Sequence, residues 1–173
     1  KSTMNGLGKC VNDYVVKTRT DIIFKSDALL AETAKIKPIR GRYKLFQHKV
    51  LSTNFYVRDP IKSNILYHPS DILLIGKKDD ISLLFNHELA TYNDFNRVGA
   101  AGGYDNKIVN EQYLLLKTME NVHNIEIPYT TFWEYKGIKK LIQSENLIFK
   151  NFSIYTVLQL GLLFPKKLIS SDP

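Results

Sequence analysis

The spacing of apolar residues changes near Gly76, and this change restricts the possible folds more than any other feature of the chain. Before it, residues 42–50 and 51–58 are rich in Tyr, Phe and Val, which favours extended strands. Residues 64–67 predict a third, short strand, and the compact apolar run 71–75 predicts a buried one. Most strands are therefore expected before residue 78.

After Gly76, apolar residues recur every three or four positions, which is the spacing of amphipathic helices. Helical spacing, here and earlier in the chain, predicts helices over 21–36, 79–95, 108–122 and 129–143. A short strand is expected over 124–127, whereas 145–163 fits either a helix or a pair of strands. We therefore expect an α+β fold, with a strand-rich N-terminal half (about 42–77) packed with helices in the C-terminal half.

The length of 173 residues fits one domain, because domains commonly contain about 100–200 residues. We predict a single globular domain over 1–173 with an irregular basic arm over about 1–18. No apolar run approaches the roughly 20 residues of a membrane helix, so no membrane span is expected. The single cysteine, Cys10, excludes an internal disulfide framework and favours a reducing, intracellular compartment.

Positive charge is concentrated in the first third of the chain. Residues 1–62 carry 13 basic and 5 acidic side chains, whereas residues 63–124 carry 5 and 8. Such a basic region predicts a polyanionic partner, either nucleic acid or an anionic membrane surface, although solubility alone is an alternative. Abundant Lys, Asn and Ile have A/T-rich codons, and this bias, with a first residue other than Met, suggests a mitochondrial protein.

Basic and aromatic residues alternate over 35–58, which is the strongest functional signal in the sequence. Basic groups neutralise phosphates and exposed aromatic rings stack on unpaired bases, so this segment predicts an RNA-binding surface. The predicted contact residues are Lys35, Lys37, Arg40, Arg42, Tyr43, Lys44, Lys49, Arg58, Arg97 and Lys107. An ordinary basic outer strand with an aromatic core face is the alternative.

The glycine-rich stretch at 99–103 does not fit a nucleotide-binding loop. A phosphate-binding loop needs Lys and Ser or Thr after its last glycine, but Tyr104 and Asp105 follow Gly103. A dinucleotide-binding loop follows a strand, whereas this stretch follows a predicted helix. The stretch is expected to be a flexible turn, or a loop able to approach the phosphates of a partner between Arg97 and Lys107.

No complete catalytic or metal-binding motif is present in the sequence. His87 and Glu88 begin a zinc-protease pattern, but Thr91 replaces its second histidine. Asp71, Glu134 and Lys136 loosely resemble the site of magnesium-dependent nucleases of the PD-(D/E)xK kind. No cofactor and no metal site are predicted.

The sequence thus predicts a non-catalytic, basic RNA-associated protein, such as a component of an organellar ribosome or another ribonucleoprotein particle. Its expected partners are RNA and other proteins of a larger assembly. Two alternatives remain open: a PD-(D/E)xK-like nuclease that uses Asp71, Glu134 and Lys136, and a scaffold subunit whose basic region binds an acidic protein.

Overall fold

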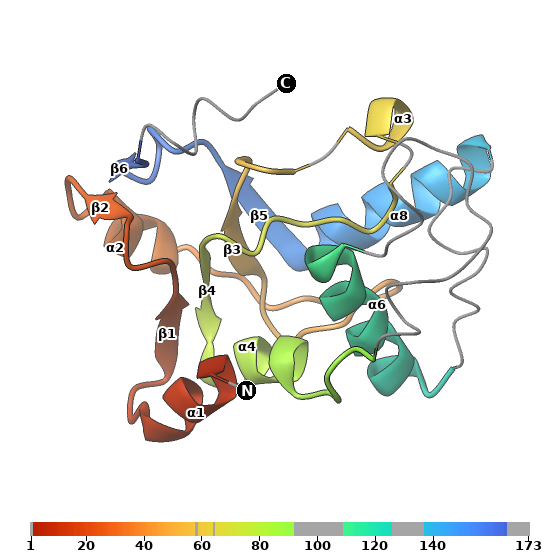
Figure 1. The fold of residues 1–173 in the computed structure, drawn as a ribbon, viewed down its shortest axis with the longest axis horizontal. Helices are drawn as coiled ribbons and strands as arrows, with labels where there is room; N and C mark the ends of the chain where they lie inside the picture. Colours follow the sequence, from red (N-terminus) through yellow and green to blue (C-terminus); the bar gives the residue numbers. More distant parts are fainter. Residues whose placement is uncertain (1, 58, 64, 92–108, 126–136, 166–173) are drawn as a thin grey trace.

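A four-stranded mixed sheet forms the centre of the computed structural model, which describes residues 2–57, 59–63, 65–91, 109–125 and 137–165 (Figure 1). In spatial order, its strands are β1 (Tyr14–Lys17), β4 (Leu74–Lys77), β3 (Val50–Thr53) and β5 (Phe152–Tyr155). Strand β4 is antiparallel to both of its neighbours, and β3 is parallel to β5. Strands β1, β3 and β5 therefore run in the same direction.

Helices and a small ribbon surround this sheet, which confirms the predicted α+β class. The helices of the described residues are α1 (Ser2–Lys9), α2 (Ala28–Thr33), α3 (Pro60–Ser63), α4 (Lys78–Phe85), α6 (Asn110–His123) and α8 (Ile138–Asn151). The ribbon pairs β2 (Ile23–Phe24) with β6 (Leu162–Leu163). None of the helices in these described ranges is both long and apolar enough to cross a membrane.

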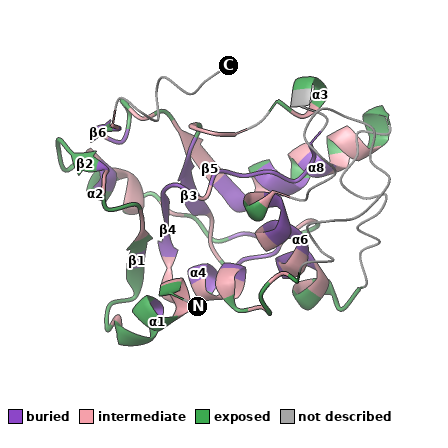
Figure 2. Cartoon of the chain, viewed as in Figure 1, coloured by how far each residue is buried: buried purple, intermediate pink, exposed green. Residues whose placement is uncertain are grey.

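Successive residues of the central strands face two different apolar clusters. Val50 and Leu74 pack in the larger cluster with residues of α4, α6 and α8. Leu51 and Ile75 pack in a second cluster that includes residues of α2 and β6. This alternation is the period of two expected for a strand with both faces covered. Figure 2 shows the buried residues along the central strands and on the inner sides of α6 and α8.

The strand predicted over 42–50 is wrong, because only Val50 belongs to a strand. Gly41 and Tyr43 have positive φ angles of 83° and 65°, which turn the backbone away from an extended path. The two ends of this segment still pair with each other. The Ile39 N–H donates to the Gln47 carbonyl at 2.8 Å, and the Lys49 N–H donates to the Lys37 carbonyl at 2.9 Å. We call the segment closed by this pairing the 37–49 loop.

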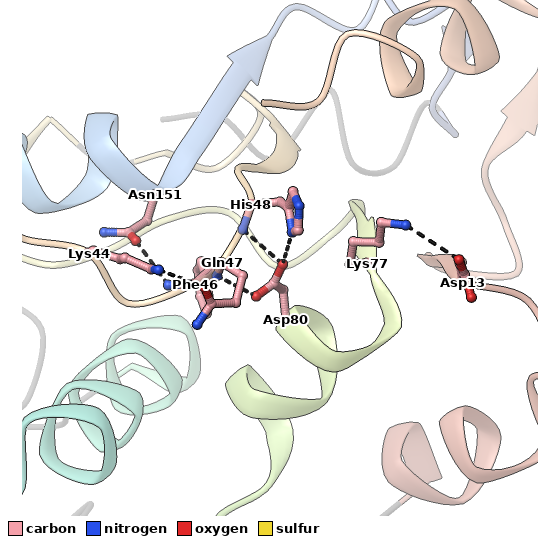
Figure 3. A network of polar contacts seen from close by, with 8 residues as sticks. All are labelled: Asp13, Lys44, Phe46, Gln47, His48, Lys77, Asp80 and Asn151. Carbon is pink, nitrogen blue, oxygen red and sulfur yellow. Dashed lines mark hydrogen bonds and ion pairs between the residues drawn. The ribbon is translucent and has the colours of Figure 1, made fainter. Parts of the chain in front are cut away.

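Two buried side chains accept hydrogen bonds from backbone N–H groups of this loop (Figure 3). Asn151 accepts hydrogen bonds from the N–H groups of Leu45 at 2.7 Å and Phe46 at 3.3 Å. The Asp80 carboxylate accepts hydrogen bonds from the next two N–H groups, at 2.7 and 3.0 Å. Because side chains from α4 and α8 satisfy these groups, the loop needs no strand partner.

The strand predicted over 64–67 is wrong for the same reason. The Tyr67 N–H donates to the Ser144 hydroxyl at 2.7 Å, and the Leu66 carbonyl accepts from the Gln112 amide at 2.7 Å. Both side chains come from helices, α8 and α6, and all four residues are buried. Helical side chains thus satisfy backbone groups that the sequence pattern assigned to a sheet.

Two predictions for the first third of the chain are also wrong. The expected irregular arm over about 1–18 contains α1 and β1, because Leu7 and Val15 bury their side chains against the core. The helix expected over 21–36 is limited to α2, because Ile23–Phe24 instead pairs with the distant strand β6. Residues far apart in sequence decide both structures.

The later helices agree better with the sequence pattern. Helix α6 matches the prediction over 108–122, whereas α4 ends at Phe85, earlier than expected. The ambiguous segment 145–163 contains both the end of α8 and the strands β5 and β6. The glycine-rich stretch lies outside the described residues. Of the predicted strand 124–127, residues 126 and 127 lie outside them too, and Asn124 and Ile125 follow α6 without forming a strand. Of the helix predicted over 129–143, residues 129–136 are outside the described residues and 138–143 belong to α8.

Candidate active site

Charged residues gather where the carboxyl ends of β1 and β3 meet the amino end of β4. The Lys17 ammonium at the end of β1 donates to the carboxylate of Asp71 at 3.0 Å and also to its backbone carbonyl. Asp71 lies three residues before β4, and the antiparallel register pairs Lys17 with Leu74. The strand order therefore brings two segments 54 residues apart into one ion pair.

A second ion pair follows β1 directly. The Arg19 guanidinium donates two hydrogen bonds to the Asp21 carboxylate, both at 2.9 Å. The hydrogen bond to Asp21 raises the pKa of Arg19, burial opposes this effect, and the charges of Asp21 and Asp71 raise the pKa further. Arg19 is thus electrostatically linked to the first ion pair through Asp71.

Helix α6 contributes a third acidic group at this edge. The Glu111 carboxylate, in the first turn of α6, lies 3.6 Å from His68 Nε2, which is an ion-pair distance. His68 is only 4% exposed, and its Nδ1 atom is buried without a hydrogen-bond partner in the described part of the chain.

The pKa of Glu111 results from opposing effects. Burial raises the pKa of this carboxyl, but His68, the local backbone and Asp71 together lower it by more, so that it lies below its ordinary value. Glu111 is therefore ionised at neutral pH. The influence of Asp71 on Glu111 indicates that the carboxyl of the segment before β4 lies near the carboxyl of α6.

Buried hydroxyl groups fix the segment that carries His68 and Asp71. The Ser52 hydroxyl of β3 donates to the Ser70 carbonyl at 2.9 Å, and the Thr53 hydroxyl lies 3.5 Å from the Ser70 hydroxyl. All three side chains are essentially inaccessible to solvent. The segment 68–71 is thus attached to the end of β3 and has little freedom to move.

A cleft of about 490 Å³ leads to this edge between α1 and β1. Its wall includes apolar Leu7 and Val15 and, toward the charged edge, Lys17, Thr18 and Arg19. The Thr18 hydroxyl is buried and has no hydrogen-bond partner in the described part of the chain. The cleft therefore combines apolar surface with an unused hydroxyl and two cations, as small-molecule sites commonly do.

We refer to these residues as the strand-end cluster: Lys17, Arg19, Asp21, His68, Asp71 and Glu111. It contains two cations, each paired with a carboxylate, and a third carboxylate that is paired with an imidazole. Within the described ranges, no group of three or more His, Cys, Asp or Glu side chains is placed to hold a metal ion. In this arrangement the carboxylates can accept a proton, and the cations can stabilise a developing negative charge.

The residues predicted to contact RNA do not form one strand face. Lys35 pairs with Glu32 at 2.7 Å, and the Arg42 guanidinium stacks over Tyr43 at 5.0 Å from the ring centroid. Lys44 donates to Gln47 at 2.6 Å, and Arg40 is exposed. Lys37 and Lys49 are joined by a backbone hydrogen bond. Arg58, Arg97 and Lys107 lie outside the described residues.

The sequence reasoning identified only one member of the strand-end cluster. Asp71 was predicted as part of a nuclease site, but its expected partners Glu134 and Lys136 lie outside the described residues. Lys17, His68 and Glu111 were missed because their partners are distant in sequence. Arg19 and Asp21 are near neighbours in sequence, but nothing local connects them to the other members. A usable signal existed in the run "KTRTD" at 17–21, where charged residues directly follow the apolar start of a strand.

Comparison with known proteins identifies a family. A family model described as "WavE lipopolysaccharide synthesis" matches residues 1–172. No curated protein and no solved structure matches the chain. The match overturns the prediction of an RNA-binding, ribosomal or mitochondrial protein. The basic, aromatic segment 35–58 misled that prediction because charge and composition alone do not distinguish RNA from other anions.

Proposed function

The chain belongs to the WavE lipopolysaccharide synthesis family, and from this premise we propose that it is a sugar-transfer enzyme whose active site is the strand-end cluster. The saccharide part of a lipopolysaccharide is built by joining sugars. Each joining step takes a sugar from an activated, phosphate-linked donor and attaches it to a hydroxyl group of an acceptor. This chemistry needs a group that accepts the hydroxyl proton and a positive charge that stabilises the departing phosphate.

In this proposal, Glu111 accepts the proton from the acceptor hydroxyl. Its side chain is 23% exposed, so an incoming hydroxyl group can reach it, and its lowered pKa keeps it ionised at neutral pH. Neighbouring His68 is buried and orients the carboxylate. Asp71 lies close enough to bind a second hydroxyl group of the substrate.

Lys17 and Arg19 supply the positive charge for the departing phosphate. Both line the cleft between α1 and β1, which therefore offers a route for the donor to the carboxylates. Asp71 and Asp21 hold the two cations in place through ion pairs of 3.0 and 2.9 Å. The observation that carries the proposal is this meeting of fixed cations and an ionised carboxylate from three separate segments.

Replacement of the proton acceptor tests the proposal. We expect Glu111→Gln to lower the rate of nucleotide release from a panel of nucleotide sugars, with purified lipopolysaccharide as acceptor, by at least about a hundredfold. Gln keeps the shape of the side chain but cannot accept a proton. The matched control is Glu88→Gln, an exposed glutamate outside the cluster, which should leave the rate unchanged. A folded Glu111→Gln protein with the normal rate would exclude this role.

A further inference from the structure

Helix α8 exposes a row of three apolar side chains along one side, and the partly buried Glu145 lies on the same side between two of them. Ile138, Ile142 and Phe149 are 64%, 52% and 58% exposed. At 100° per residue, these three positions lie within about 40° of one another around the helix axis. The core-facing side of α8 carries Leu147 and Ile148, which are buried. Ile138, Ile142 and Phe149 are therefore apolar side chains of α8 that the core does not cover.

Three lysines gather beside the C-terminal end of this row. The Lys49 ammonium donates to the carbonyl of Phe149 at 2.9 Å, and Lys150 is the next residue of α8. The Lys49 N–H donates to the Lys37 carbonyl at 2.9 Å, so the third lysine adjoins the other two. Phe149 thus lies at the junction of the apolar row and the lysines. We call these six residues, Ile138, Ile142, Phe149, Lys37, Lys49 and Lys150, the docking face.

The three lysines of the docking face lack carboxylate partners in the described part of the chain. Among the described residues, no carboxylate forms an ion pair with Lys37, Lys49 or Lys150. Burial lowers the pKa of Lys49, and the charges of Lys150 and Lys37 lower it further. Three like charges held together repel one another, and an external anion would relieve this repulsion.

The lysines are also held in position from beneath. Asn151, which follows Lys150, is buried and binds the backbone of the 37–49 loop. Asp80 binds the same loop two residues before Lys49 (Figure 3). These contacts fix the loop against α8, so that little conformational freedom is lost when an anion binds.

We propose that the docking face binds the surface of an anionic membrane, with Ile138, Ile142 and Phe149 entering the headgroup region and the three lysines contacting lipid phosphates. Exposed apolar side chains of a helix with lysines beside them, here Lys150 of α8 and two lysines of the adjoining loop, are features of surfaces that bind a membrane interface. A soluble polyanion would leave the apolar row in water, whereas a membrane covers both parts of the face. This inference concerns attachment and is independent of the proposed sugar transfer.

Vesicle sedimentation tests the proposal without any turnover of substrate. We expect the protein to sediment with vesicles of phosphatidylcholine containing phosphatidylglycerol and to remain in solution with pure phosphatidylcholine. Lys49→Gln/Lys150→Gln should weaken binding roughly tenfold or more. The double control Lys9→Gln/Lys25→Gln removes the same charge from exposed sites elsewhere and should have a much smaller effect.

A separate substitution tests the contribution of the apolar row to vesicle binding. Phe149→Ser should weaken vesicle binding severalfold, whereas Leu30→Ser, at a 67% exposed position on α2, should not. Equal losses in both lysine pairs would mean that net charge alone drives binding, and would overturn the proposal. So would an absence of vesicle binding, or displacement by millimolar inorganic phosphate at constant ionic strength, which would indicate a site for free phosphate instead.

Discussion

Glu111 and Glu145 are both partly buried carboxyls, yet their surroundings move their pKa in opposite directions. Burial raises the pKa of Glu111, but His68 and Asp71 reverse that effect. Burial also raises the pKa of Glu145, and the charge of Asp59 raises it further. No partner within the described ranges compensates Glu145 in this way, so its ionisation at neutral pH opposes folding.

Glu145→Gln is therefore expected to stabilise the protein at pH 7. A carboxyl with a raised folded-state pKa holds its proton more tightly in the folded protein, so the fold loses stability as the pH rises through the lower, unfolded-state pKa, and the loss is complete above the folded-state pKa. The variant should melt up to a few degrees higher than the wild type at pH 7, and the difference should vanish below about pH 4, where both states are protonated. Thermal unfolding of both proteins between pH 3 and pH 8 measures this. A constant difference at all pH values would contradict the electrostatic explanation.

At the scale of elements, buried polar side chains decide where strands stop. The residues of the 37–49 loop have a strand-like composition, but Asn151 and Asp80 supply the hydrogen bonds that a neighbouring strand would have supplied. Ser144 and Gln112 do the same for residues 66 and 67. Propensity and periodicity contain no information about such distant partners. For this reason the amphipathic helix α6 was predictable, whereas the strands predicted over 42–50 and 64–67 were wrong.

Asn151→Leu is expected to be strongly destabilising. Asn151 accepts from the N–H groups of Leu45 and Phe46 and donates to the carbonyls of Tyr43 and Leu147. A leucine of similar size leaves these buried backbone groups without partners, at a cost of roughly 2–5 kcal/mol in the free energy of unfolding. Urea unfolding measures the loss. The control Asn146→Leu, at an exposed position of the same helix, should change stability by less than about 0.5 kcal/mol. Similar losses in the two variants would contradict this role of Asn151.

At the scale of the whole molecule, the sheet order assembles the candidate site. Because β1 and β3 both flank β4, the segment before β4 meets the ends of both strands, and α6 adds Glu111 at the same edge. The sequence could identify Asp71 as a chemically interesting residue, but it could not pair Asp71 with Lys17 or Glu111, since those pairs depend on strand order. The excess of basic residues over 1–62 is a property of the sequence, but it does not distinguish RNA from other anionic partners.

The most direct test of the central claim is a double-mutant cycle on the strand-end cluster. Asp71→Asn, Glu111→Gln and the double variant are compared for nucleotide release from nucleotide sugars in the presence of lipopolysaccharide. If the two carboxylates act in one active site, each single variant should lose at least about a hundredfold in rate, and the double variant should lose far less than the product of the two. Normal rates in folded single variants, or strictly multiplicative losses, would contradict a shared sugar-transfer site.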